Sequence, residues 1–177
     1  MNTIIKMLLS AIIMLSVILP YSNTSHHPGS LQTFASLGWT GSLIFIALFF
    51  VAIAFYCRAL ERCLYLIAPQ RRKASPRSVW LMFLIPYNFI EDFFIMIHLS
   101  RSLEEEARFN ARLLGIKDYG MGTGMGWCMA QLLSFLPGAA GQIAGALGLI
   151  LWLLHWRFIH NMLKILNPTG KSYTHEI

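Results

Sequence analysis

Polar side chains inside long apolar stretches are the residues of this sequence best placed to do chemistry. Asn88, Glu91 and Asp92 lie within the apolar segment 79–98, and Gln131 lies in a later apolar stretch. A carboxyl group at the centre of a bilayer costs roughly 2.5–3.5 kcal/mol, so such groups are expected to face other protein groups or a polar path. The functional interpretation is a relay for protons or cations.

A structural role competes with this relay. Adjacent helical residues point about 100° apart, so Glu91 and Asp92 cannot both face one narrow site. The pair can instead lie at a helix break near the lipid headgroups, with hydrogen bonds to Tyr87, Asn88 or Gln131. We favour this structural placement over the relay.

Other catalytic patterns are missing from the sequence. His98 and His155 lie near the ends of apolar stretches, where two facing imidazoles could ligate haem, but without paired spacing they are predicted to be interfacial polar groups. The cysteines have no C-x-x-C spacing, so we predict neither a zinc site nor a disulfide framework. No H-E-x-x-H, G-x-S-x-G or phosphate-loop pattern occurs. We therefore predict a non-enzymatic protein without a metal or cofactor.

The composition indicates which elements must position these side chains. Of the 177 residues, 56% are hydrophobic and 12% are charged, whereas soluble domains carry about 25% charged residues. Because every backbone N–H and C=O in lipid needs an internal partner, long apolar runs favour helices. We predict an all-α integral membrane bundle of about four spans, preceded by a signal peptide or anchor, in the inner membrane of a bacterium.

The apolar runs also predict where the helices lie. Trp39 and Tyr56 are expected to be interfacial anchors of the first span, and the helix can continue beyond it to about residue 68. Pro86 predicts a kink in the second span, because proline lacks an N–H and clashes with the preceding turn. The predicted segments are a signal peptide or anchor over 1–20, an exported loop over 21–40, a membrane domain over 41–166 with spans at 41–57, 79–98, 121–136 and 139–158, and a polar tail over 167–177.

Pro137-Gly138 divides the last apolar block. As one helix, residues 120–166 would be about 70 Å long, more than twice the hydrocarbon thickness of about 30 Å. We predict a hairpin of two spans; the alternative is one kinked span with an interfacial first half. A cytoplasmic C-terminal end would contradict the four-span arrangement with this hairpin.

Basic residues concentrate between the first two predicted spans. The net charge of +6 comes from 14 Lys and Arg against 8 Asp and Glu. Basic loops stay on the cytoplasmic side and attract anionic headgroups, so we predict contact with the lipid bilayer and not with nucleic acid. The residues assigned to this topology and headgroup role are Arg58, Arg62, Arg71, Arg72, Lys73 and Arg77.

Gly141, Gly145 and Gly148 lie three or four residues apart in the last predicted helix. This spacing lets helix backbones approach closely; internal packing is the main expectation, and a homo-oligomer face is the alternative. The predicted function is helix packing with another copy or with a larger membrane complex. The alternative function is a small transporter or channel component with a polar path through the acid pair.

A family resemblance agrees with this fold. Trp80 with the leucine-rich stretch after it, then Ile85-Pro86 and Asn88, resemble the shared feature of a family of small, uncharacterised, multi-span bacterial membrane proteins. Residues 136–138 and 148–158 resemble the closing helical hairpin of that family. The resemblance covers the predicted membrane domain and implies a multi-span fold, but no substrate. The acid pair departs from the apolar, aromatic or amide residues expected there.

Overall fold

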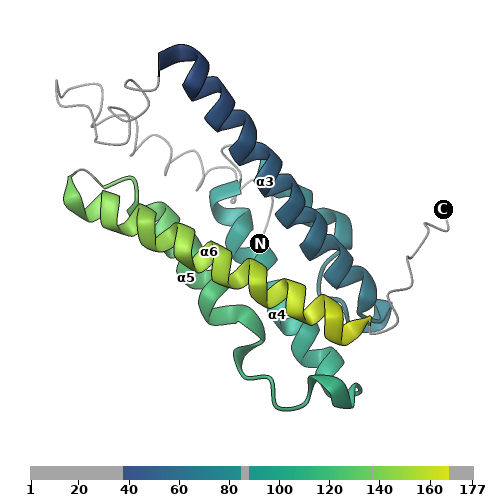
Figure 1. Cartoon of the computed structure of the whole chain (residues 1–177). Coiled ribbons are helices and arrows are strands. Elements are labelled where there is room, and N and C mark those ends of the chain that lie inside the picture. The colour runs from purple at the N-terminus through teal and green to yellow at the C-terminus, as the bar shows by residue number, and fades with distance from the viewer. Residues whose placement is uncertain (1–37, 85–87, 137, 168–177) are drawn as a thin grey trace.

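The protein folds into a bundle of helices (Figure 1). The computed structural model describes residues 38–84, 88–136 and 138–167. The predicted segment 1–20, nearly all of the exported loop and nearly all of the polar tail lie outside these ranges. The long helices are α3 (Gly38–Leu66), α4 (Asn88–Ala107), α5 (Met121–Leu133) and α6 (Ala139–Leu166), and the short 3-10 helices are η1 (Pro69–Arg71), η2 (Pro76–Phe83), η3 (Ala111–Leu113) and η4 (Asp118–Gly120). The predicted all-α class is confirmed over the described ranges.

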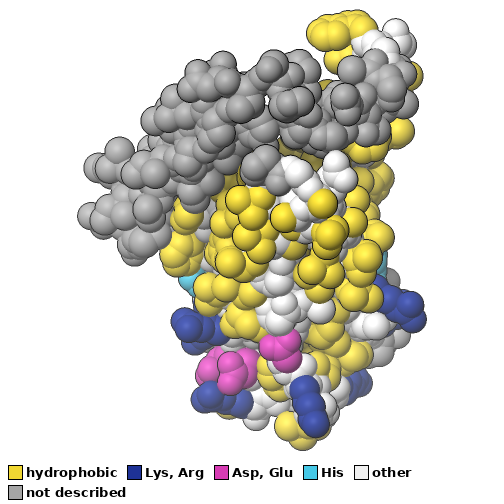
Figure 2. All heavy atoms as spheres, turned by 90° about the vertical axis from the view of Figure 1, so that its left-hand side faces the viewer, with side chains coloured by type: hydrophobic (Ala, Val, Ile, Leu, Met, Phe, Trp, Pro, Cys, Tyr) yellow, Lys and Arg dark blue, Asp and Glu magenta, His cyan; other side chains and the backbone are white. Residues whose placement is uncertain are grey.

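Two helices, α3 and α6, are long and apolar enough to cross a membrane. The most apolar stretches of α3 and α6 have mean hydropathies of 2.5 and 1.4, and only 22% of the residues in each are buried. A core helix of a soluble protein would bury most of such a stretch. Figure 2 shows a broad band of hydrophobic side chains, with the charged side chains of this face toward one end. These features suggest association with a membrane and give two candidate spans; four spans remain a prediction.

The predicted span over residues 79–98 is not one helix. Residues 76–83 form η2, and α4 begins only at Asn88. Pro86 lies between them, outside the described residues. Proline has no backbone N–H to donate and disfavours helical geometry in the residue before it. The sequence therefore yields two separate helical segments here.

The contacts of η2 show that it runs antiparallel to α3. Trp80 Nε1 donates a 3.2 Å hydrogen bond to Glu61 near the C-terminal end of α3. Further along η2, the ring of Phe83 stacks on that of Phe50, with centroids 6.1 Å apart. The following helix, α4, returns, so that Glu106 pairs with the loop after α3. Together η2 and α4 form a hairpin whose two ends lie at the same end of the molecule.

The last apolar block folds into α5 and α6, which pack side by side and antiparallel. Near the turn, an added Cβ on Gly148 would lie 3.4 Å from the Cβ of Ala130; at the other end, Gly120 lies against the ring of Phe158. Helix α5 has 13 residues, a length of about 20 Å, which is less than the hydrocarbon thickness of about 30 Å. It is shorter than the predicted span over 121–136.

The hydrophobic core lies toward the C-terminal ends of α3, α4 and α6. In α3 the buried residues begin at Tyr56, whereas the earlier large residues from Leu43 to Val51 are exposed. The C-terminal end of α3 is capped by Arg72, whose guanidinium donates to the carbonyls of Ile67 and Tyr65 at 2.8 and 2.9 Å. The N-terminal half of α3 carries the exposed apolar surface, and the packed and capped C-terminal half holds the helix in the bundle.

Candidate functional site

A partly enclosed cavity between the helices is the strongest candidate site in the described part of the chain. Its volume is about 260 Å³, and it lies between α3, α4, α5 and α6. It brings together Asp92 and Gln131, two of the residues singled out from the sequence. The lining residues are Phe49, Phe50, Ile53, Tyr56, Met82, Asp92, Trp127, Gln131, Ser134, Gly145, Gly148, Leu149 and Trp152.

Asp92 is the acidic group of this cavity. Its side chain is 3% exposed, and Oδ1 makes no hydrogen bond with any residue that the structure describes. Asp92 follows the first turn of α4, which begins at Asn88. Unpaired N–H groups and the positive end of the helix dipole favour negative charge near such a terminus. The local helix thus explains why a carboxyl is tolerated here, while Oδ1 is left able to accept a hydrogen bond.

Glu91 points elsewhere. It is buried, with 6% of its surface exposed, but it does not line the cavity, as expected for neighbours about 100° apart on a helix. Asp92 shares the cavity lining with Phe50 and Tyr56 of α3, the helix that carries the exposed apolar surface. The side chain of Asn88 is outside the described part of the structure, so its predicted place on a polar path stays a prediction.

Tyr56 forms a wall of the cavity and is held firmly. Its hydroxyl lies 2.7 Å from Nδ1 of His155, a buried hydrogen bond whose direction depends on the imidazole tautomer. The rings of Trp127, Trp152 and Trp156 surround it edge-on, with centroids 5.7 to 5.9 Å away. The sequence suggested only an interfacial anchor for Tyr56. The pairing with His155 gives no local signal, because it joins two helices far apart in the chain.

Trp152 adds an unpaired donor to the cavity. Its indole Nε1 is buried and has no acceptor among the residues that the structure covers, and the same holds for Trp156. Trp152 lines the cavity and Trp156 does not. Two residues of the cavity lining therefore carry a buried polar atom without a partner in the described chain, an acceptor on Asp92 and a donor on Trp152. Buried polar groups normally have a partner, so both atoms suit a bound molecule.

The two histidines predicted to be interfacial lie on different helices, His98 on α4 and His155 on α6. His155 is buried and hydrogen-bonded to Tyr56, so it is not an interfacial group. Within residues 38–84, 88–136 and 138–167, no three His, Cys, Asp or Glu side chains are grouped so that they could hold a metal ion.

The three glycines of α6 contact α5 and the turn after it. An added Cβ on Gly141 would collide with the carbonyl oxygen of Leu136, and one on Gly145 would lie 3.6 Å from Ser134 Cβ. Gly148 faces Ala130, as described above. This close approach of two helices of one chain also gives the cavity part of its wall, since Gly145 and Gly148 line it.

The basic loop divides into two groups. Arg71 pairs with Glu106 at 2.9 Å and lies over the ring of Phe109, and Arg72 caps α3. These two arginines are half-buried and hold the loop against α4. The four exposed basic residues have side chains free to reach headgroups: Arg58 and Arg62 lie in the last part of α3, and Lys73 and Arg77 follow it.

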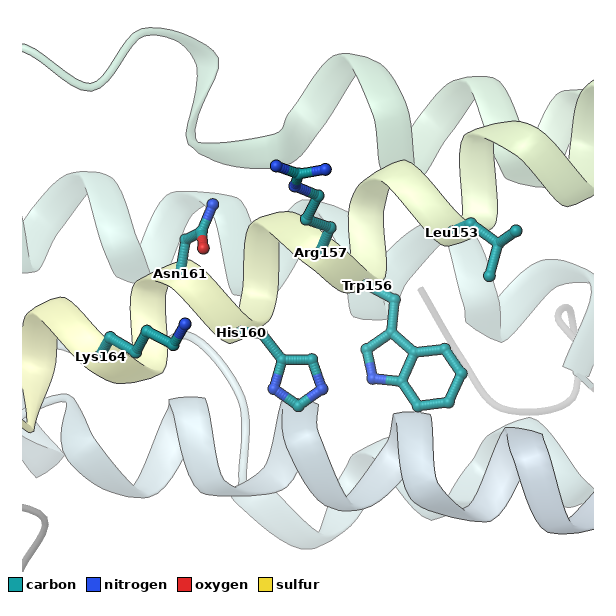
Figure 3. Close-up of a pocket in the computed structure, with 6 residues that line it drawn as sticks. All are labelled: Leu153, Trp156, Arg157, His160, Asn161 and Lys164. Atoms are coloured by element: carbon teal, nitrogen blue, oxygen red, sulfur yellow. The ribbon is translucent and has the colours of Figure 1, made fainter.

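A second hollow lies on the surface of α6 (Figure 3). Its six lining residues all come from this helix, with Arg157 and Asn161 on one side and Trp156 and His160 on the other. A hollow made by one helix encloses little. The change from Leu153 to polar side chains along it suits the boundary between hydrocarbon and headgroups. The cavity at Asp92 is therefore the stronger candidate site.

Comparisons with protein families, with curated proteins and with solved structures find no match to this chain. The resemblance to small bacterial membrane proteins stays a prediction.

Proposed function

We propose that this protein is a non-enzymatic membrane protein that binds a small solute inside its helical bundle, as a transporter or channel component. The observation that carries the proposal is Asp92, a buried carboxyl with an unpaired oxygen on the wall of a cavity shared by four helices. An unpaired buried polar atom costs about 1–3 kcal/mol. A bound solute would recover that energy.

In the proposed arrangement α3 and α6 cross the membrane in the same direction. The hairpin of η2 and α4 enters and leaves on the side of the basic loop, and α5 with the residues around it returns the chain to the start of α6. The antiparallel contacts of Trp80 and Phe83 with α3 support this hairpin. The exposed bases of the loop support a cytoplasmic position for that side, in a bacterial inner membrane.

Assembly with another copy or a larger membrane complex has less support as the function. Gly141 and Gly148 would have to offer a face to a partner, but both are buried against α5 and the turn after it. The open apolar surfaces of α3 and α6 suit lipid equally well. Solute binding therefore ranks above partner binding.

The reactivity of a cysteine placed on the cavity wall tests the proposal without knowledge of the solute. In Asp92→Cys, a thiol on the cavity wall should react with methyl methanethiosulfonate, a small neutral reagent, in detergent-purified protein. Glu91→Cys is the matched control, because Glu91 is buried beside it but does not line the cavity. We expect the thiol at position 92 to react at least about tenfold faster than the thiol at position 91, equivalent to about 1.4 kcal/mol in barrier height.

Mass spectrometry would follow both reactions. Wild-type protein supplies the background, since Cys57, Cys63 and Cys128 are all buried. Equal, slow rates at positions 91 and 92 would mean that no small solute reaches Asp92, and the proposal would fall.

A further inference from the structure

We infer that the solute is a small organic cation, held with its ammonium group between Asp92 and the aromatic walls of the cavity. This inference rests on the proposed solute binding and names the chemical class of the solute. It is carried by three features of the cavity: its charge, its walls and its size.

The charge of the lining favours a cation. Among the described residues that line the cavity, Asp92 is the one acidic group, and none is Lys, Arg or His. The ion pairs seen in the described chain, such as Arg71 with Glu106, do not involve Asp92. An ammonium group beside the Asp92 carboxyl would stabilise its ionised form, so a cation is the natural complement of this lining.

The walls favour an organic cation over a metal ion or water. Aromatic side chains from three elements line the cavity, among them Tyr56, Trp127 and Trp152. Aromatic faces attract ammonium groups, by about 2 kcal/mol or more where the site is dry. A hard metal ion would need several oxygen ligands instead. A water molecule could donate a hydrogen bond to Asp92 Oδ1, but water would leave the apolar aromatic surfaces hydrated, which is unfavourable.

The size and the remaining polar groups limit the molecule further. A volume of about 260 Å³ is below the roughly 300–1,000 Å³ of pockets for drug-sized ligands. Trp152 Nε1 is an unpaired donor within the described chain, and the amide of Gln131 lies on the same lining. The fitting molecule is therefore a small ammonium compound that also carries an oxygen acceptor, such as a hydroxyl or ester.

The route into the cavity is expected to lie between α3 and α6. Three lining residues, Phe49, Phe50 and Leu149, are also exposed on the apolar surface, by 43%, 38% and 54%. At these three positions a single layer of side chains separates the cavity from the outer surface. An amphiphilic cation dissolved in the bilayer can thus approach from the side.

A pair of isosteric probes separates charge from shape. Choline and 3,3-dimethylbutan-1-ol have the same shape and hydroxyl group, but only choline is charged. Equilibrium dialysis of radiolabelled choline against purified protein, with the alcohol as competitor, measures both affinities. In wild-type protein choline should bind at least about tenfold more tightly, and Asp92→Asn should abolish this preference. Glu91→Gln, the matched control, should keep it.

A second variant guards against misfolding of Asp92→Asn. Trp152→Phe keeps an aromatic ring but removes the indole donor. It should weaken choline binding more than binding of tetramethylammonium, which has no hydroxyl. Loss of both by the same factor would overturn the assigned role of Trp152.

The remaining outcomes distinguish failure of the cation inference from failure of the proposed solute binding. Equal binding of choline and the neutral alcohol would overturn the cation class and leave solute binding standing. If neither probe binds but the thiol of Asp92→Cys reacts, the cation class is likewise overturned and solute binding stands. Binding of neither probe, with an unreactive thiol, would overturn both.

Discussion

Tyr56 and Asp92 lie on the wall of the same cavity, but only Tyr56 has its polar atom paired. The hydroxyl of Tyr56 is bonded to His155, whereas Asp92 Oδ1 has no partner within the described chain. The two residues therefore differ in role: the hydrogen bond fixes the aromatic wall, and the carboxyl is available to a ligand. Replacing Tyr56 should alter stability first, while replacing Asp92 should alter binding first.

The hydrogen bond of Tyr56 gives a prediction at the residue scale. Tyr56→Phe keeps the ring among its tryptophan neighbours but leaves Nδ1 of buried His155 without a partner. We expect the free energy of unfolding to fall by about 1–3 kcal/mol, measured by reversible unfolding in mixed detergent micelles with increasing SDS. Tyr119→Phe is the control, because the Tyr119 hydroxyl makes no hydrogen bond within the described residues. Equal effects of the two substitutions would contradict the prediction.

At the scale of elements, the contact of α5 with α6 depends on glycine positions that are not equivalent. Gly141 has the carbonyl oxygen of Leu136 where a Cβ would be, and Gly145 has room at ordinary contact distance from Ser134. The same glycine pattern in the sequence thus contains one position that requires glycine and one that does not. The physical reason for this difference is the sharp turn after α5, which brings backbone against the first turn of α6.

Alanine substitutions at these two glycines test the close contact. Gly141→Ala should destabilise the protein by about 1–3 kcal/mol, because backbone must move to admit the methyl group. Gly145→Ala should be neutral, or stabilising by up to about 1 kcal/mol, because alanine is the better helix former. The same SDS unfolding measurement applies. A larger loss for Gly145→Ala would contradict this and would indicate that Gly145 faces a second copy of the chain.

At the scale of the whole molecule, the C-terminal ends of α3, α4 and α6 lie at one end. The parallel course of α3 and α6 follows from their contacts: Phe49 shares the cavity wall with Gly145, and further along Tyr56 bonds His155. In the proposed topology, the hairpin of η2 and α4 replaces the second predicted crossing and changes which side each later segment occupies. Both helices that can cross the membrane then run in the same direction.

Side-specific labelling tests this topology. In membrane vesicles, a membrane-impermeant thiol reagent should reach Lys73→Cys, Arg112→Cys and Lys164→Cys from the same side, and Trp39→Cys from the other. All four positions are exposed, and the native cysteines are buried. Four full spans would instead place positions 112 and 164 opposite position 73. That result would refute the hairpin of η2 and α4 within the membrane.

The helical class and the helices that can cross a membrane could both be predicted from the amino-acid sequence. Long apolar runs with few charges leave α-helix as the way to pair every backbone group in lipid, and α3 and α6 cover the runs predicted as the first and last spans. Asp92 and Gln131 could also be identified, since polar groups in apolar runs are conspicuous. These are local properties, readable from composition along one segment.

Which of these groups meet depends on the packing of the helices and could not be predicted. The pairing of Tyr56 with His155, the unpaired oxygen of Asp92 and the aromatic walls of the cavity require four helices packed together. The kink predicted at Pro86 lies between two separate segments, η2 and α4. The sequence could not predict that η2 packs antiparallel to α3 and that α4 runs back along the bundle. A contact between two distant segments leaves no periodic pattern in the sequence of either segment. Such contacts therefore cannot be predicted from hydrophobic periodicity along the chain.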